Sequence, residues 1–129
     1  MNASDPPDLP KPTAAELEIL RVLWRLGPST VREVQEDRSK TGYTTILKLL
    51  QIMAEKGLVE RDEQNRAHVY RATLTEDATQ QSLVDDLLDK AFGGSAQKLV
   101  LHALQGKTAS ADELAAIRRY LDELEKEQS

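Results

Sequence analysis

Residues 41–59, TGYTTILKLLQIMAEKGLV, begin with small and hydroxyl side chains and continue with a single apolar stripe. The spacing of this stripe predicts a helix, and Lys56 and Gly57 predict its end, just before a strand-like segment. A helix of this kind can bury one side in a core while its polar first turn enters a groove. The major groove of DNA accepts a helix of this size. We therefore interpret this segment as a DNA-recognition helix that leads into a strand.

Two further helices are predicted before this segment, because each begins with a capping box. Thr13 and Glu16 form the first box, and Thr30 and Glu33 form the second. In each box, the two side chains hydrogen-bond backbone N–H groups that have no partner at a helix start. The first helix is expected to end at Leu26, before a Gly-Pro pair. The apolar residues expected to face the core are Leu17, Leu20, Leu23 and Trp24 on the first helix, Val31 and Val34 on the second, and Ile46, Leu49, Leu50 and Met53 on the third.

After these helices the apolar period changes from helical to strand-like. Residues 58–61 and 67–71 are predicted strands, and residues 62–66 between them are a predicted hairpin turn. Asn65 suits that turn because asparagine tolerates a positive φ better than most residues. Three helices followed by a hairpin form a winged helix-turn-helix. The predicted fold class is therefore mainly α with a small β-hairpin, the wing, over residues 13–73.

The remainder of the chain, residues 74–129, has a helical pattern throughout. Thr75, Ser95 and Ser110 are predicted to begin three helices, of which the last carries apolar residues at coiled-coil-like spacing. Fewer than sixty residues in three helices make a poor independent core, so a second copy of the chain is the simplest cover for their apolar stripes. We expect a homodimer held by this dimerisation region, whose contact residues are Leu87, Leu88, Leu99, Leu114, Ile117, Leu121 and Leu124.

The composition excludes several classes of protein. The 129 residues contain no cysteine, which excludes disulfides, thiolate metal sites and cysteine nucleophiles. No apolar run approaches the roughly 20 residues that a membrane span needs. Residues 1–12 are polar and proline-containing, without the apolar core of a signal peptide. We expect a cytoplasmic protein without membrane insertion, and we interpret residues 1–12 as a flexible arm.

The net charge of −5 argues against strong non-specific binding to nucleic acid, but the charge is unevenly distributed. Residues 1–73 contain eleven basic and eleven acidic residues, whereas residues 74–129 contain six basic and eleven acidic ones. Within residues 38–56, four basic side chains accompany a single acid, Glu55. Since local charge decides contact with phosphate, the acidic total remains compatible with a sequence-specific DNA-binding domain.

In the order of these elements, the chain resembles the penicillinase-repressor family of winged-helix transcriptional repressors, the BlaI/MecI/CopY type. The resemblance covers nearly the whole chain from Thr13 onward and rests on residues 16–20, 23–24, 44–46, 56–59, 66–70, 93–95 and 99–101. It implies a homodimeric repressor on a palindromic operator of double-stranded DNA. The better-known members control operons for β-lactamase or for an altered cell-wall transpeptidase. The resemblance therefore suggests control of β-lactam-resistance or cell-envelope stress genes.

The resemblance also implies a route of induction. In the better-known members, a membrane sensor with a cytosolic metalloprotease domain triggers cleavage of the repressor within its dimerisation region, after an asparagine and before a phenylalanine. The matching residues here are His102 and Ala103, which depart from the family pattern. They are a candidate cleavage position without the family's specificity, and a sensor protease is a candidate partner. Copper-responsive relatives carry a C-terminal cysteine pair motif, which the absence of cysteine excludes here.

The residues expected to contact DNA lie on the recognition helix and around it. Tyr43, Thr44 and Thr45 begin that helix, and Lys48 lies one turn further. Threonine hydroxyls can hydrogen-bond bases or phosphates, and threonine methyls can pack on the thymine methyl, although threonines also often only cap a helix. The other candidates, expected to contact phosphates or, from the wing, the minor groove, are Arg38, Lys40, Arg66, His68, Thr30 and Arg32.

Two other functions compete with this interpretation. An enzyme would need a catalytic set, but His68 and His102 are the only histidines, and the chain has no glycine-rich phosphate loop or metal-spaced ligand set. No catalytic residue, metal or cofactor is therefore predicted. A winged helix that binds protein instead of DNA stays open, because residues 1–73 are near neutral and the whole chain is acidic. Basic side chains gathered on one face would favour DNA over a protein partner.

Overall fold

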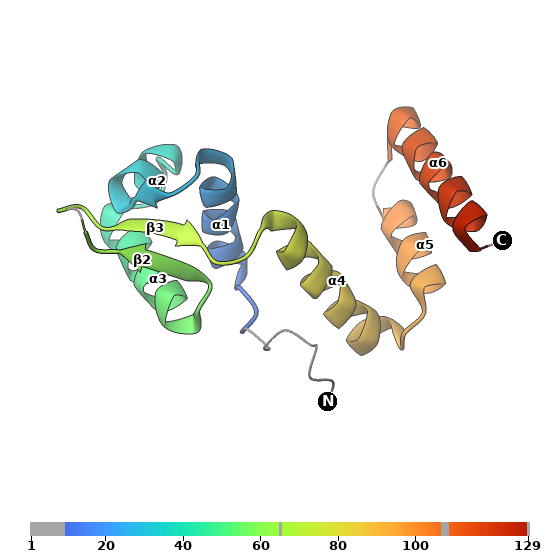
Figure 1. Cartoon of the computed structure of the whole chain (residues 1–129), viewed down its shortest axis with the longest axis horizontal. Helices are drawn as coiled ribbons and strands as arrows, with labels where there is room; N and C mark the ends of the chain where they lie inside the picture. Colours follow the sequence, from blue (N-terminus) through green and yellow to red (C-terminus); the bar gives the residue numbers. More distant parts are fainter. Residues whose placement is uncertain (1–9, 65, 107–108, 129) are drawn as a thin grey trace. The chain divides into compact units, whose positions relative to one another are not determined.

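The computed structural model describes residues 10–64, 66–106 and 109–128. These residues form two compact units that divide inside one helix, between Leu83 and Val84 (Figure 1). The first unit contains α1 (Ala14–Leu26), β1 (Ser29–Thr30), α2 (Val31–Asp37), α3 (Tyr43–Lys56), β2 (Val59–Asp62), β3 (Val69–Ala72) and the start of α4 (Glu76–Phe92). The second contains the rest of α4, α5 (Ala96–Gly106) and α6 (Ala111–Gln128). The predicted class, mainly α with a small sheet, is confirmed. Most of the expected arm, residues 1–9, and the turn residue Asn65 lie outside the described residues.

The helices of the first unit begin where their capping signals predict. Thr13 N–H donates to Glu16 Oε1 at 2.9 Å, and Glu16 N–H donates to Thr13 Oγ1 at 3.2 Å. Thr30 and Glu33 make the same exchange at 3.0 and 3.2 Å, so both capping boxes are confirmed. α3 ends at Lys56 and is capped by Gly57, whose φ of 84° lies in the left-handed region that favours glycine.

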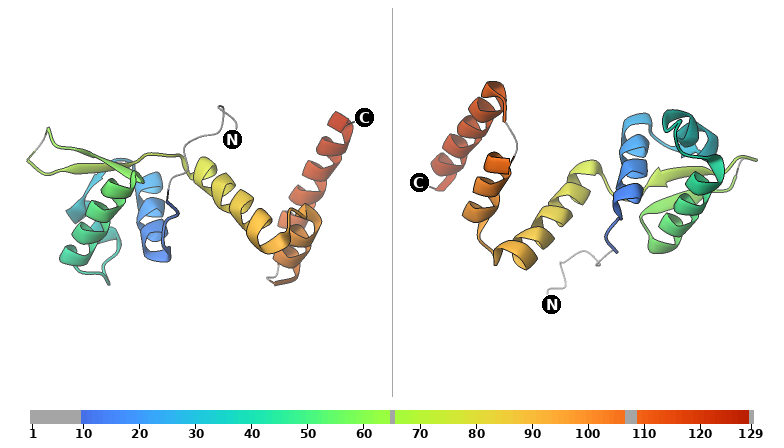
Figure 2. Two further views of the ribbon diagram at one scale, coloured as in Figure 1. Left: turned by 90° about the horizontal axis from the view of Figure 1, so that it is seen from below. Right: turned by 180° about the vertical axis from the view of Figure 1, so that it is seen from behind.

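The sheet has three strands rather than the two of the predicted hairpin. Its order is β1-β3-β2, all antiparallel, and Ser29 of β1 pairs with Tyr70 of β3. β1 is only two residues long, so it has no alternating pattern that a sequence could reveal. The predicted strand limits were wrong by one to two residues: the ladder ends at the pair Asp62 and Val69, and His68 precedes β3 instead of lying on it. In both views of Figure 2 the β2–β3 hairpin extends from the three helices as a wing.

The core of the first unit lies between α1, α2, α3 and the sheet. The prediction that Trp24 is a core residue was only partly right, because Trp24 is half-buried near the end of α1, where Leu26 is already 49% exposed. Leu17 and Leu49 also pack against the core without being fully buried. The buried apolar residues are Ile19, Leu20, Val22, Leu23, Val31, Val34, Ile46, Leu50, Met53, Leu58, Val59 and Tyr70.

The second unit leaves its apolar side chains accessible. Among the residues described for α5 and α6 none is buried, and Leu87 of α4 and Leu121 of α6 are 48% and 51% exposed. The predicted helix starts in the C-terminal region are confirmed, since backbone N–H groups are capped by the hydroxyls of Thr75, Ser95 and Ser110. None of the helices in the described ranges has both the length and the apolar character required to cross a membrane.

Candidate nucleic-acid interface

The outer face of α3 is polar and exposed, whereas its apolar stripe is buried in the core. Tyr43 is 47% exposed, and the side chains of Thr44, Thr45 and Lys48 also lie in solvent. The N-cap of α3 is Gly42, which has no side chain for capping, so the two threonines lie inside the first turn rather than at the cap. The first turn of this helix therefore presents an aromatic ring and two hydroxyls, with an ammonium group one turn further.

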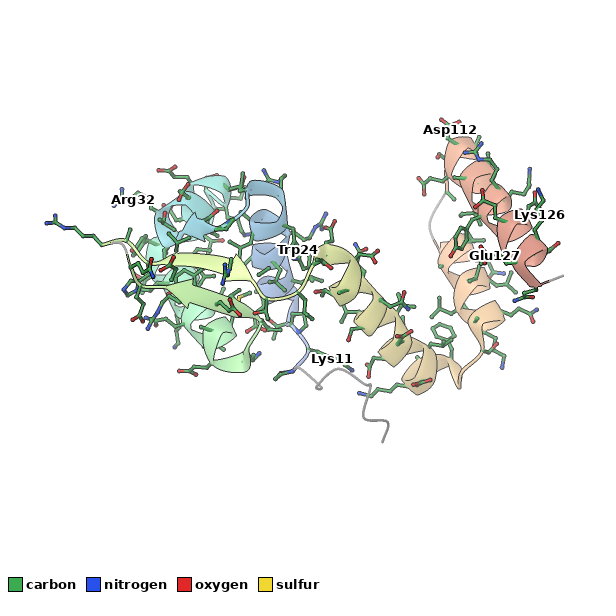
Figure 3. All side chains as sticks on the ribbon, viewed as in Figure 1. Lys11, Trp24, Arg32, Asp112, Lys126 and Glu127 are labelled. Atoms are coloured by element: carbon green, nitrogen blue, oxygen red, sulfur yellow. The ribbon has the colours of Figure 1, made fainter. Side chains whose placement is uncertain are left out.

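A groove of about 310 Å³ lies beside this turn, between the start of α2, α3 and the loop before β3. Segments that are distant in the sequence meet there, and Figure 3 labels Arg32 at its α2 side. Leu47 also lines the groove and was missed by the sequence analysis, although its position one helical turn after Tyr43 would have indicated it. The predicted DNA-contact residues that the structure brings together in this groove are Thr30, Arg32, Tyr43, Arg66 and His68.

Several basic residues of the first unit form ion pairs. These pairs are Arg25 with Asp37, Arg38 with Glu18, Lys56 with Glu16, Arg61 with Glu63, and Arg71 with Glu60. Four predicted DNA-contact residues, by contrast, have no ion pair with any residue in the described part of the chain: Arg32, Lys40, Lys48 and Arg66. These four cations keep their charge available for an external anion.

Arg38 differs from these four cations because it already has an ion-pair partner. Its guanidinium lies 2.6 Å from a carboxylate oxygen of Glu18 on α1. Both residues line another pocket, together with Arg25 and Asp37, that does not include the residues of the groove. Arg38 therefore holds α2 against α1, and contact with a phosphate would require it to exchange partners.

The acidic residues of the wing are occupied by internal partners. These contacts join Glu60 to Arg71, Asp62 to the N–H of Gln64, and Glu63 to Arg61. Arg66, on the same loop, is exposed. Glu60 and Glu63 are thus offset by Arg71 and Arg61, whereas Asp62 keeps its negative charge because a backbone N–H does not neutralise it. The positive charge that the wing can offer to DNA is therefore the exposed guanidinium of Arg66.

A partly buried ion pair lies at the far end of α3. The Glu16 carboxylate is 2% exposed and accepts two hydrogen bonds from Lys56 Nζ, at 2.9 and 3.0 Å. Burial alone would raise the pKa of Glu16, but the Thr13 N–H and the Lys56 ammonium outweigh it and lower that pKa. The pair ties the start of α1 to the end of α3, so it orients the helix whose first turn lies beside the groove. The capping box predicted the contact of Glu16 with Thr13, but no local pattern indicated its ion pair with Lys56, which lies 40 positions away.

A three-helix core with a wing, in which the third helix exposes its first turn beside that wing, defines a winged helix-turn-helix protein. The family model described as penicillinase repressor matches residues 12–123. The chain therefore belongs to the penicillinase repressor family, a family of winged-helix transcriptional regulators and not of enzymes.

Individual relatives agree with this assignment. The chain is 37% identical over 115 residues to the transcriptional regulator BlaI of Mycobacterium tuberculosis, covering 85% of this chain and 82% of the relative. It is 25% identical over 118 residues to the penicillinase repressor of Bacillus licheniformis, covering 89% and 92%. Among solved structures, the apo form of MarR from E. coli is similar in fold, with a TM-score of 0.50 and 20% identity over 88% of this chain and 77% of that one.

Proposed function

We propose that this protein is a sequence-specific DNA-binding repressor that acts as a homodimer on a palindromic operator. The observation that carries the proposal is that Arg32 and Arg66, two exposed cations without an ion pair among the described residues, line one groove with Tyr43 of the first turn of α3. Phosphate oxygens are the natural partners of such cations, and a polar helix start of this width suits the major groove. Residues 13–73 are the DNA-binding domain in this proposal, and residues 74–129 are the dimerisation region.

In this proposal, some residues of α3 and the groove contact DNA bases and others contact the phosphate backbone. Tyr43, Thr44 and Thr45 enter the major groove, where hydroxyl and methyl groups can distinguish base edges. Lys48 reaches a base or a phosphate one turn deeper. The residues assigned to phosphates, or to the minor groove at the wing, are Thr30, Arg32, Lys40, Arg66 and His68.

The accessible apolar residues of the second unit support the homodimer. Leucines at 40 to 51% exposure on amphipathic helices are costly for a monomer in water, and a second copy would bury them. The contact residues proposed are Leu87, Leu88, Leu99, Leu114, Ile117, Leu121 and Leu124. Two linked winged domains would then read half-sites about one or two turns of DNA apart, roughly 34 Å per turn.

The names of the relatives support a role in antibiotic resistance. They include a penicillinase repressor and methicillin resistance regulatory proteins. We infer control of β-lactam-resistance or cell-envelope stress genes, from the cytoplasm. A sensor protease acting on this chain would have to open α5 first, because His102 and Ala103 lie within its hydrogen-bonded turns.

The test is a charge reversal at the proposed interface. DNA that the full chain prefers is first selected from a random library, and the double variant Lys48→Glu, Arg66→Glu is then titrated against it. Loss of at least about a hundredfold in affinity is expected, because two phosphate or base contacts become repulsive. Lys98→Glu, an exposed lysine of α5, is the matched control and should bind normally.

The same experiment separates DNA binding from the alternative of a protein-binding winged helix. A wild-type chain that selects no DNA sequence would favour the protein partner. A double variant that binds DNA as well as the wild type would show that Lys48 and Arg66 do not form the DNA interface.

A further inference from the structure

One hydrogen bond joins the end of α1 to the segment that leaves the sheet. The indole Nε1–H of Trp24 donates to the backbone carbonyl of Leu74 at 2.9 Å, across 50 positions of sequence. Figure 3 labels Trp24 between α1 and the start of α4. Leu74 lies in the short connection between β3 and α4. A phenylalanine could supply the same apolar contacts, but only the indole can donate this hydrogen bond.

The rest of this connection is also held to the first unit. Thr73 N–H donates to the carbonyl of Leu58 at 3.0 Å, directly after β3. Thr75 caps α4 by accepting from Ala78 N–H at 3.1 Å, and Thr79, in the second turn of α4, is only 8% exposed. No stretch of free chain therefore separates the winged domain from α4.

α4 continues unbroken from this anchored start. It runs from Glu76 to Phe92 and crosses the division between the two compact units at Leu83 and Val84. A helix of this length extends about 25 Å at 1.5 Å per residue. This single helix connects the anchored segment after β3 to Leu87, one of the proposed dimer contacts.

We propose that Trp24 is a positioning residue for operator recognition: by holding Leu74, it sets the direction in which α4 leaves the winged domain and so the preferred spacing of the two half-sites. This proposal rests on the proposed function as a dimeric repressor. When two DNA-binding domains are joined stiffly, avidity is highest at one spacing and falls steeply at others. If the connection between β3 and α4 is loosened, the dimer can bind operators with several spacings, but it binds the preferred spacing less tightly.

The experiment compares the wild type with Trp24→Phe, which keeps a ring and removes the donor. Operators built from the selected half-site carry the preferred spacer or one changed by about two base pairs. The wild type should lose about tenfold or more in affinity at the changed spacer, whereas Trp24→Phe should lose less than about threefold. Binding to a single half-site should stay within about twofold for both proteins, because α3 and the wing are untouched.

A second pair of variants tests the connection between β3 and α4 without changing Trp24. Thr75→Ala removes the cap at the start of α4 and should also weaken the spacing preference. Ser95→Ala removes the same kind of cap from α5, which is not part of this connection, and should leave the spacing preference unchanged.

The outcomes are distinct for the two proposals. A Trp24→Phe protein with the wild-type spacing preference would overturn the positioning role. Loss of half-site affinity together with a lowered melting temperature would overturn it too, since Trp24 would then matter only for the fold. A wild-type chain without any preferred DNA would instead contradict the proposed function.

Discussion

At the scale of single residues, the site depends as much on which charges are paired as on which are present. Arg38 and Lys48 are both basic residues near the recognition helix in sequence. The structure joins Arg38 to Glu18, however, and leaves Lys48 without an ion pair among the described residues. Sequence reasoning could place both near DNA but could not separate them, because the partner of Arg38 lies on another helix, 20 positions away.

Glu16 gives a prediction about stability and pH. Glu16→Gln keeps the side-chain acceptor of the capping box but removes the charge that pairs with Lys56, so it should lower the free energy of unfolding by about 2 kcal/mol near pH 7. The pKa of Glu16 in the folded protein lies below its usual value. The ionised side chain therefore stabilises the folded state fully when the pH is above the usual pKa, and this stabilisation is lost as the pH falls through the folded-state pKa. Urea unfolding of both proteins at about pH 7 and pH 3 should show the difference shrinking on acidification. A difference that grows at low pH would contradict this account.

At the scale of secondary structure, elements with local signals were predictable and elements formed by tertiary pairing were not. Capping boxes and terminal glycines act within a few residues, so the limits of α1 and α3 and the start of α2 followed from the sequence. β1 forms only because Ser29 and Thr30 pair with β3, about forty residues later in the chain. No local sequence pattern predicts this strand. The groove was partly predictable: five of its residues were named, but nothing local indicated that the starts of α2 and α3 meet the wing.

The end of α3 offers a test at this scale. Gly57→Ala should lower the free energy of unfolding by about 1 kcal/mol or more, because alanine is strained at a φ of 84°. Thermal unfolding followed by circular dichroism measures the change. Gly106→Ala is the matched control, since Gly106 has an ordinary φ and open space around it, and the substitution should be neutral or slightly stabilising. Equal melting temperatures for Gly57→Ala and the wild type would show that the left-handed cap is unimportant.

At the scale of the whole molecule, the two compact units differ in what they bury and what they expose. The first buries a continuous core and exposes Arg32, Lys48 and Arg66, which have no ion pair among the described residues, whereas the second exposes leucines that a partner copy could cover. Residues 1–73 carry no net charge and the excess of acid lies in residues 74–129, so the acidic total does not oppose DNA binding by the winged domain. Repression in this account requires both, because one half-site contact alone is weak and two linked contacts are strong.

Dimerisation through α6 can be tested in the intact chain. Leu121→Glu places a charge in the proposed seam and should raise the dimer dissociation constant by at least about a hundredfold. Sedimentation equilibrium measures this constant. Ala116→Glu adds the same charge at an exposed position of α6 outside the seam and should remain dimeric. A dimeric Leu121→Glu protein would exclude this face from the interface.

The most direct test of the central claim is binding of the purified full chain to the DNA upstream of its own gene, at two salt concentrations, with random DNA as competitor. We predict saturable binding that resists the competitor, weakens as salt is raised, and protects two half-sites related by a dyad. Binding that the random DNA abolishes, together with no preferred sequence in a selection from a random library, would contradict the account and favour a protein partner for the winged domain.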